Sequence, residues 1–433
     1  MKNTLFLKNG QFPDGSVKNL LIEDDRIIYI GDKSFSNVEQ IDCTGKLILP
    51  GIIDVHTHIR DMGLSYKEDW LSASKAAASG GITTMFDMPN TKPATFDMDS
   101  LTEKRKAASK SLVNFGYNFG VTEFNSEQFR KAAPIASIKM FMAESSSGYV
   151  VEREEIVRQV FKLAREIDKP VMIHAELQSC VEEHEMKYAA TIQNHNKIRN
   201  PICAIKATEL LIRLAEETGA KVYLAHISLK EEIDMIRAAK NRGLKNIFCE
   251  ITPHHLFINE TILEQAGNYG KVNPPLRTEA DNKAIEQAII DGTVDTIGTD
   301  HAPHGLDEKN KEYNLAPSGF PGLETSLGLM MKLVQSGKIS IQKLNELMSS
   351  NPAEIYKIKD RGSLQINNYA DICIVNPGTK WIVNPENFYT KAKYSPYAGM
   401  SLTGKVETTI INGKTIWHNN QITESRGKEV EFS

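Results

Sequence analysis

The sequence predicts an α/β fold in which eight parallel strands and their helices form a (β/α)8 TIM barrel. Short apolar segments alternate with longer amphipathic segments through the middle of the chain. Eight such apolar segments over roughly 300 residues fit a closed barrel better than an open doubly wound sheet. Several of them end in histidine or aspartate, and the fourth carries a lysine inside its end, at the face of a barrel where active sites are built.

The strand candidates are short and apolar, and they lie at 51–57, 83–89, 113–121, 137–143, 170–175, 221–227, 246–252 and 294–300. Between most of them apolar residues recur at three- and four-residue spacing, as in EEIVRQVFKLAREI and ICAIKATELLIRLAEE, which predicts helices. A dinucleotide-binding sheet would need a glycine fingerprint after its first strand. HTHIRDMG stands at that place instead.

Both ends of the chain predict short strands joined by tight turns. The segments are TLFLKNG, NLLIEDDRIIYIGD and KLILPG near the start, and ADICIVN and TGKVETTIINGKTIW near the end. Because chain termini often lie close together, we expect residues 1–49 and 362–433 to form one composite β-domain. The barrel would then span residues 50–361.

The composition is ordinary for a globular protein, with 41% hydrophobic and 24% charged residues. A formal net charge of −4 gives no electrostatic basis for binding nucleic acid or an anionic membrane. The sequence has no apolar run of membrane-spanning length and no signal-peptide pattern, so we expect a cytoplasmic protein. The five cysteines lie far apart and form no CxxC pair, which favours reduced, mostly buried thiols.

The histidines at the strand ends have the spacing of metal ligands. His56 and His58 are two residues apart on a strand, so both side chains leave the same face, roughly 6–7 Å apart. A lone strand histidine is more often a hydrogen-bonded core residue. Because His174 and His226 lie at two later strand ends, a shared metal site becomes the better interpretation of the pair. The pattern is typical of a metal-dependent hydrolase. Asp300 ends the last strand and could both bind metal and accept a proton from water, although aspartate is also a common turn residue.

Lys139 is an unusual residue for a barrel strand, because SIKMFMA is otherwise apolar. A buried ammonium costs several kcal/mol unless it is compensated, and a lysine that reaches solvent is the alternative. A deprotonated buried amine could take up CO2 and become a carbamate. That group is a bidentate anion, suited to bridging two metals roughly 3.5–4 Å apart.

Nine blocks of the sequence together resemble the dihydroorotases of the cyclic amidohydrolase superfamily. In order they are PGIIDVHTHIRD, DMPNTKP, IKMFMA, VMIHAE, AHISLKEEI, PHHLF, KVNPPLR, TDHAPHGLDEK and GFPGLET. They cover about residues 45–360, and the flanking β-segments also resemble that superfamily's small domain. HxH with a terminal Asp is shared with hydantoinases, dihydropyrimidinases, allantoinases and urease. HIRD with PNT, NPPLR and DHAPH is much narrower.

The resemblance implies reversible, metal-dependent hydrolysis of L-dihydroorotate to N-carbamoyl-L-aspartate, the third step of pyrimidine biosynthesis. It implies two zinc ions, although other divalent metals also fit, and the carbamate-lysine branch of the family rather than its aspartate branch. It assigns His56, His58 and Asp300 to the more buried metal, His174 and His226 to the second, and carbamylated Lys139 to the bridge. Asp300 would also be the catalytic base.

The expected substrate carries a carboxylate, and Arg60 is the natural partner for it. Arg60 lies two residues after His58, so on an extended path it points the same way, and its planar fork fits a carboxylate. A solvated loop arginine is the alternative. The resemblance adds contacts to the substrate ring. The full set of expected substrate contacts is His58, Arg60, Asn90, Asn273, His304, Ser318 and Gly319.

Five further histidines are expected to have no direct catalytic role. His254 and His255 follow the seventh strand, and we expect them to be supporting groups near the mouth of the barrel. His184, His195 and His418 are expected to be ordinary exposed residues.

Two other functions are weighed against this prediction. A hydantoinase or dihydropyrimidinase would need no carboxylate clamp, so Arg60 and His304 argue against it. A non-catalytic barrel that serves as a scaffold would be expected to lose ligands, and all six positions are filled. The expected partner is a small-molecule substrate. A homo-oligomer and a complex with another enzyme of the pyrimidine pathway both stay open.

Overall fold

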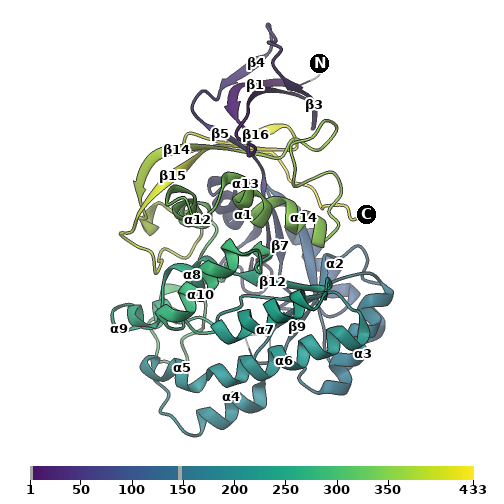
Figure 1. The fold of residues 1–433 in the computed structure, drawn as a ribbon, viewed down its shortest axis with the longest axis vertical. Helices are drawn as coiled ribbons and strands as arrows, with labels where there is room; N and C mark the ends of the chain where they lie inside the picture. The colour runs from purple at the N-terminus through teal and green to yellow at the C-terminus, as the bar shows by residue number, and fades with distance from the viewer. Residues whose placement is uncertain (1–2, 145–148) are drawn as a thin grey trace.

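The computed structural model describes residues 3–144 and 149–433, which form two β-sheets and the helices around them (Figure 1). One sheet is the centre of the barrel. The other is built from both chain ends and lies beyond one side of the barrel along the long axis of the molecule.

The barrel sheet contains eight parallel strands in sequence order, from β6 to β13. Its strands are β6 Ile52–Thr57, β7 Ile82–Asp87, β8 Asn114–Gly120, β9 Ser137–Phe141, β10 Val171–His174, β11 Val222–Leu224, β12 Ile247–Ile251 and β13 Thr296–Ile297. The first and last strands meet where the His58 N–H donates to the carbonyl of His301 at 2.8 Å. The described strands therefore form a nearly closed barrel, which confirms the predicted fold class. Because helices cover such strands, most of their residues are buried whichever face they occupy.

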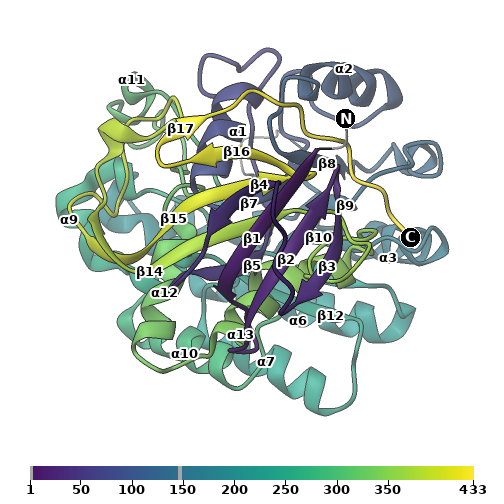
Figure 2. The same ribbon diagram turned by 90° about the horizontal axis from the view of Figure 1, so that it is seen from above.

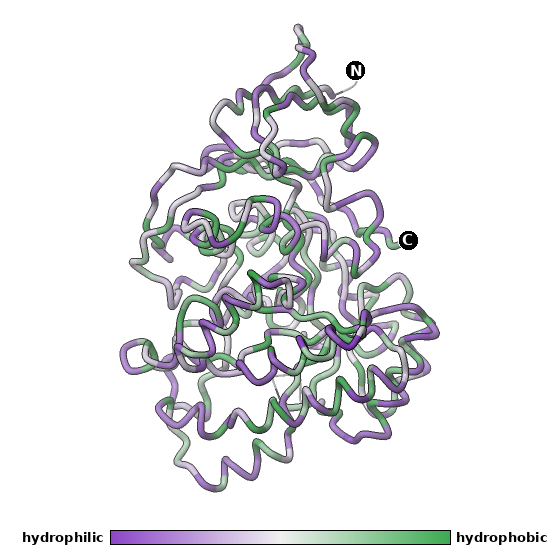
Figure 3. The backbone as a smooth tube through the Cα atoms, viewed as in Figure 1, coloured by the Kyte–Doolittle hydropathy of each residue, from purple (hydrophilic) through white to green (hydrophobic). Residues whose placement is uncertain are grey.

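Helices follow most of the barrel strands and bury one face against them. In α3 the buried residues are Val157, Val160, Phe161 and Ala164, which recur at helical spacing. In Figure 3 the outer helices alternate hydrophobic and hydrophilic stretches in the same way. The α-helices are α1 Trp70–Ser79, α2 Met98–Ala108, α3 Glu154–Glu166, α4 Gln178–Glu185, α5 His195–Ile198, α6 Pro201–Thr218, α7 Lys230–Asn241, α8 Pro253–Phe257, α9 Leu263–Ala266, α10 Glu279–Ile290, α11 Leu306–Lys309, α12 Ser326–Gln335, α13 Ile341–Asn345 and α14 Asn351–Ile355.

The second sheet joins the two ends of the chain. Its strands are β1 Thr4–Gln11, β2 Val17–Glu23, β3 Arg26–Gly31, β4 Glu39–Asp42, β5 Leu47–Pro50, β14 Ile372–Ile382, β15 Ser401–Ile411, β16 Lys414–His418 and β17 Gln421–Ile422. The join is the antiparallel pair β5–β14, in which Leu49 lies opposite Cys373. Figure 2 shows the early strands, in purple, beside the late ones in yellow and green. The composite sheet is present, while the domain limits themselves stay a proposal.

The last residues of the chain leave this sheet and run along the barrel. The Phe115 N–H in β8 donates to the carbonyl of Lys428 at 3.0 Å, and the Val430 N–H donates to the carbonyl of Phe115 at 2.9 Å. The C-terminal segment thus adds to the outer wall of the barrel.

The expectation that all cysteines are reduced is wrong for one pair. Cys180 in α4 and Cys203 in α6 form a disulfide, because these two helices bring residues 23 positions apart to a Cα–Cα distance of 5.4 Å. The other three cysteines are free and buried, as expected. Among the described helices, none is both long and apolar enough to cross a membrane.

Candidate metal and substrate site

The structure brings the six predicted metal ligands together at the carboxyl ends of the barrel strands. They come from β6 or its end (His56, His58), β9 (Lys139), β10 (His174), the residues after β11 (His226) and the residues after β13 (Asp300). All six are buried, and the most exposed, Asp300, has an exposed fraction of 8%. The sequence spacing alone could not show this convergence, because it depends on closure of the barrel.

Three of these side chains form one compact donor group. The ligand atoms of His56, His58 and Asp300 all lie within 4.8 Å of one another. The Asp300 Oδ1 atom is 3.0 Å from His58 Nε2 and 3.3 Å from His56 Nε2. Burial lowers the pKa of His58 to about 3, so its imidazole is neutral, the form that binds metal.

His174 and His226 form a second donor pair beside the first group. The His174 Nδ1 and His226 Nε2 atoms face each other at 3.0 Å, and the His226 ring lies 5.3 Å from the His56 ring. Burial holds the pKa of His226 well below its usual value, so it too is a neutral donor.

Lys139 is fully buried, and its Nζ atom has no hydrogen-bond partner among the described residues. Burial lowers the pKa of this amine to about 8. An unpaired buried amine beside imidazole and carboxylate donors is an incomplete arrangement, since buried polar groups are normally hydrogen-bonded. The donor set therefore fits divalent metal ions and a carbamate on Lys139.

Two buried glutamates orient the ligand histidines. Glu250 Oε1 accepts from His56 Nδ1 at 2.7 Å, and Glu176 Oε2 accepts from His174 Nε2 at 2.9 Å. Arg199 in turn donates to Glu176 Oε2 at 2.7 Å. Such contacts fix the ring orientation of metal-binding histidines. Neither glutamate is among the predicted site residues, although Glu176 lies two residues after His174 and so could have been expected on the same side of the strand.

The backbone is strained at three positions of the site. Arg60, His226 and Asp300 have positive φ angles of 65°, 40° and 48°. Residues other than glycine rarely adopt this conformation, and such strain gathers at functional sites.

The predicted carboxylate-binding residues lie next to the first donor group. Arg60 is 3% exposed, its Nε atom has no partner among the described residues, and its terminal nitrogen is 3.2 Å from His304 Nε2. His304 Nε2 donates to the Ser318 carbonyl at 3.0 Å. Asn90 Oδ1 accepts from His58 Nδ1 at 2.7 Å, so this residue also orients a predicted ligand.

The predicted ring-binding residues come from two neighbouring loops. Ser318 Oγ donates to Asn273 Oδ1 at 3.2 Å, which joins the loops. Lys309 donates to the carbonyls of Pro317 at 2.8 Å and Gly319 at 3.0 Å. These hydrogen bonds hold the loop that carries Ser318. The structure therefore brings all the expected substrate contacts to one mouth.

The other histidines differ from expectation at two positions, His184 and His195. His255 Nε2 lies 3.1 Å from the Pro274 carbonyl, so it is a supporting group. His254 is also buried, and its ring packs 5.0 Å from that of Phe320. His184 is half-buried, and His418 is exposed.

The prediction that His195 is exposed was wrong. Its side chain is 1% exposed, with Nε2 2.8 Å from the Val272 carbonyl and Nδ1 2.8 Å from the Tyr313 hydroxyl. The short helix α5 packs against the loop that leads to Asn273. That contact is tertiary and has no local sequence signal.

Comparison with known proteins agrees with this geometry. Residues 47–416 match the amidohydrolase family. The chain belongs to the amidohydrolase family. Membership of this family implies a cyclic amide hydrolase that depends on metal. The disulfide-linked helices α4 and α6 both lie within the matched part of this amidohydrolase.

Several curated relatives of this amidohydrolase are named dihydroorotase. A protein of Trichlorobacter lovleyi named dihydroorotase is 36% identical over 95% of this chain and 99% of its own length. A dihydroorotase of Methanosarcina mazei is 35% identical over 100% of this chain and 97% of its own. Among solved structures, the L-hydantoinase (dihydropyrimidinase) of Arthrobacter aurescens has a TM-score of 0.94 and 28% identity, covering 99% of this chain and 100% of that one.

Proposed function

We propose that this amidohydrolase catalyses the reversible hydrolysis of L-dihydroorotate to N-carbamoyl-L-aspartate, the third step of pyrimidine biosynthesis. The observation that carries the proposal is Arg60, a buried cation without a carboxylate partner among the described residues, beside a convergent set of metal donors. The names of the curated relatives support it.

The donor set supports a centre with two divalent metals, and zinc is the ion that such histidine-rich ligation favours. In this proposal one ion is held by three residues, His56, His58 and Asp300, and the other by His174 and His226, with carbamylated Lys139 between them. When bound, such ions polarise a carbonyl and lower the pKa of water to about 7.

Arg60 would recognise the substrate. The planar guanidinium matches the carboxylate next to the dihydroorotate ring, and Asn90 and His304 lie beside it. The loops that carry Asn273 and Ser318–Gly319 would hold the ring. The substrate carboxylate would thus compensate a positive charge that the protein itself leaves unpaired.

Asp300 would transfer the proton. Although burial raises its pKa, the neighbouring His56 and His58 hold the pKa of Asp300 well below the usual range, so it is a carboxylate at neutral pH. It can accept a proton from the attacking water and deliver it to the leaving ring nitrogen. The strained backbone at Asp300 holds the carboxylate beside the two imidazoles.

A hydantoinase or dihydropyrimidinase is the second candidate, favoured by the solved structure described above. Neutral cyclic amides would leave Arg60 without an anion. Steady-state kinetics with dihydroorotate and dihydrouracil on zinc-loaded protein separate the two functions. We expect dihydroorotate to be preferred by at least ~10-fold, because a hydrogen bond to a charged group contributes about 1.5–3 kcal/mol. A preference for dihydrouracil would overturn the proposal, and zinc-stripped protein is the control.

The proposal also includes a cytoplasmic location and either a homo-oligomer or a complex with another pyrimidine-pathway enzyme. Cell fractionation and native mass measurement test these two points independently of activity. A non-catalytic scaffold would bind no stoichiometric zinc, so metal analysis tests that alternative.

A further inference from the structure

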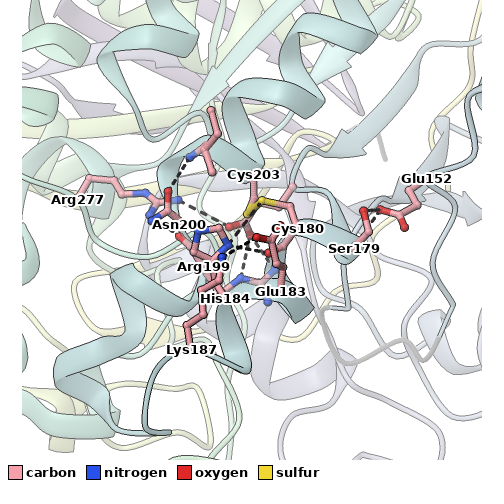
Figure 4. The surroundings of a disulfide bond; sticks show 12 residues. Glu152, Ser179, Cys180, Glu183, His184, Lys187, Arg199, Asn200, Cys203 and Arg277 are labelled. Carbon is pink, nitrogen blue, oxygen red and sulfur yellow. Dashed lines mark hydrogen bonds and ion pairs between the residues drawn. A yellow bond between two sulfur atoms is a disulfide. The ribbon is translucent and has the colours of Figure 1, made fainter.

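The disulfide between α4 and α6 lies beside a histidine that the predicted active site does not use (Figure 4). His184 follows Cys180 by one helical turn, so both side chains lie on the same face of α4. The His184 Nδ1 atom is 3.9 Å from the Cys180 sulfur. Cys203 reaches the same point from the first turn of α6.

These three side chains have the chemistry and spacing of a metal site. Their donor atoms, two sulfurs and one imidazole nitrogen, all lie within 4.8 Å of one another. Both cysteines are buried, at 7% and 0% exposure. Thiolate and imidazole are the ligands that zinc prefers.

The helix that carries Cys180 and His184 is acidic. The sequence of α4 is QSCVEEHE, with three glutamates and no lysine or arginine. Glu183 pairs with Lys187 at 2.5 Å, and the charge of the other two glutamates favours a nearby cation. In α4 the buried residues are Cys180 and Val181, which pack with Cys203 and Leu177 in a small cluster of their own. The helix therefore depends on the link to α6 for much of its attachment.

We propose that Cys180, His184 and Cys203 form a redox-gated site for one zinc-like divalent cation, separate from the catalytic set. A dithiol or phosphine reductant supplies two electrons that break the S–S bond, and two protons complete the two thiols. Each thiol then loses its proton to solvent as both sulfurs and the imidazole bind the ion. The three protein ligands leave a fourth tetrahedral position for water.

The geometry requires only local movement. Two sulfurs bound to one zinc at ~2.3 Å lie roughly 3.8 Å apart, which is further than a disulfide allows. The sulfurs must therefore separate, and His184 Nδ1 must leave its 2.8 Å hydrogen bond to the Cys180 carbonyl. Because α4 has so few buried residues, it can make this shift without disturbing the barrel.

The site is connected to the predicted catalytic centre through the backbone. The Leu177 N–H donates to the carbonyl of Cys203 at 3.2 Å, which ties the start of α4 to α6. Leu177 directly follows Glu176, the carboxylate that orients His174. Either the disulfide or the bound ion would hold this segment, whereas the reduced, metal-free protein would have neither link.

Cobalt(II) tests the proposal without reference to activity. The full-length protein, with zinc in the catalytic centre, is titrated with Co2+ after reduction by a phosphine and again without reduction. A thiolate ligand gives a sulfur-to-cobalt charge-transfer band, which the nitrogen and oxygen donors of the catalytic centre cannot give. We expect one equivalent of cobalt with this band in the reduced protein and no band in the oxidised protein.

Variants assign the band to these residues. Cys203→Ser should lose it, and His184→Ala should weaken cobalt binding by at least ~10-fold, the effect of losing one ligand contact of about 1.4 kcal/mol. Cys43→Ser, which removes a free buried thiol from the connection between β4 and β5, should leave the band unchanged. Absence of the band in reduced wild type, or an unchanged band and affinity in His184→Ala, overturns the proposal. His184→Ala keeps the test decisive if Cys203→Ser fails to fold, because His184 is only half-buried.

Discussion

Buried lysines and arginines have different partners in two regions of this protein. One region is the mouth, at the carboxyl ends of the barrel strands, and the other is the shell of helices and loops around the barrel. In the mouth, Lys139, Arg60 and Lys309 form no ion pair with any carboxylate of the described residues. In the shell, Lys104 is equally buried but lies 2.6 Å from Asp87 Oδ2 and donates to the Met88 carbonyl at 2.6 Å. Arg361 in the shell likewise pairs with Asp371.

This difference separates structural charges from charges kept for ligands. A buried charge is costly unless it is paired, so the shell cations are compensated within the protein. Among the mouth cations, Lys309 is held by the carbonyls of Pro317 and Gly319, whereas Arg60 would be compensated only when an anion arrives from outside. For Lys139, reaction of the neutral amine with CO2 would replace the cation by a carbamate anion that metal ions compensate. For Arg60 the compensating anion is the substrate carboxylate. A buried cation that has neither a carboxylate partner nor a full set of hydrogen bonds, such as Arg60 or Lys139, thus marks where a ligand is expected.

The sharpest test in the mouth is Lys139→Ala. If this lysine bridges the metals, its loss should lower kcat by at least ~1,000-fold, since metal assistance supplies several kcal/mol of transition-state stabilisation. Acetate or propionate should restore part of the activity, because a small carboxylate can occupy the space left by the side chain. Native mass spectrometry should show one added CO2 on the wild type. Full activity in the variant would remove Lys139 from the centre.

Asp300 is the anionic counterpart, a buried carboxylate that contacts imidazoles but no lysine or arginine among the described residues. Asp300→Asn should keep the fold and lower kcat by roughly 10²–10⁴-fold, because an amide can neither accept nor return the proton. Steady-state rates and zinc content check this together. A loss below ~10-fold with zinc retained would exclude Asp300 as the base.

Arg60→Met should raise KM for dihydroorotate by roughly 10- to 150-fold while both metals stay bound. The lost contact is a hydrogen bond to a charged group, which contributes about 1.5–3 kcal/mol. The same change should matter little for dihydrouracil, which has no carboxylate. Equal weakening of both substrates would mean that Arg60 is structural, like the shell cations.

Lys309→Met should have a smaller effect of the same kind. This side chain holds the carbonyls of Pro317 and Gly319, so its loss should loosen the loop that carries Ser318. We expect KM to rise by about 10-fold or less, with kcat nearly unchanged, because one such interaction contributes about 1.5 kcal/mol. Lys311→Met, an exposed lysine two residues further on, is the matched control. A fall in kcat with KM unchanged would contradict the positioning role.

The barrel and the candidate metal site could be predicted because both leave local signals. All eight strands lie where the apolar segments predicted them, to within a few residues, and HxH spacing fixes the shared face of His56 and His58. The Cys180–Cys203 disulfide and the burial of His195 could not be predicted, because each depends on how distant segments pack. The pairing of Lys104 with Asp87 is tertiary in the same way.

The shell cation Lys104 should give the smallest effect on catalysis and a clear effect on stability. Lys104→Met leaves Asp87 buried with its main partner gone, and breaking a buried pair typically lowers the free energy of unfolding by about 3–5 kcal/mol. Lys106→Met, exposed on the same helix, should stay within ~0.5 kcal/mol of wild type. Denaturant titration measures both variants.

The KM for dihydroorotate of the folded Lys104→Met protein decides whether Lys104 also positions the mouth. Asp87 Oδ1 also accepts from the Ile59 N–H at 2.8 Å, directly between His58 and Arg60, so the shell pair touches the backbone of the mouth. Because that hydrogen bond involves the other carboxylate oxygen, we expect it to survive, and KM to stay at the wild-type value. If KM rises as in Arg60→Met, Lys104 positions the mouth, and the distinction between shell charges and ligand charges fails at this pair.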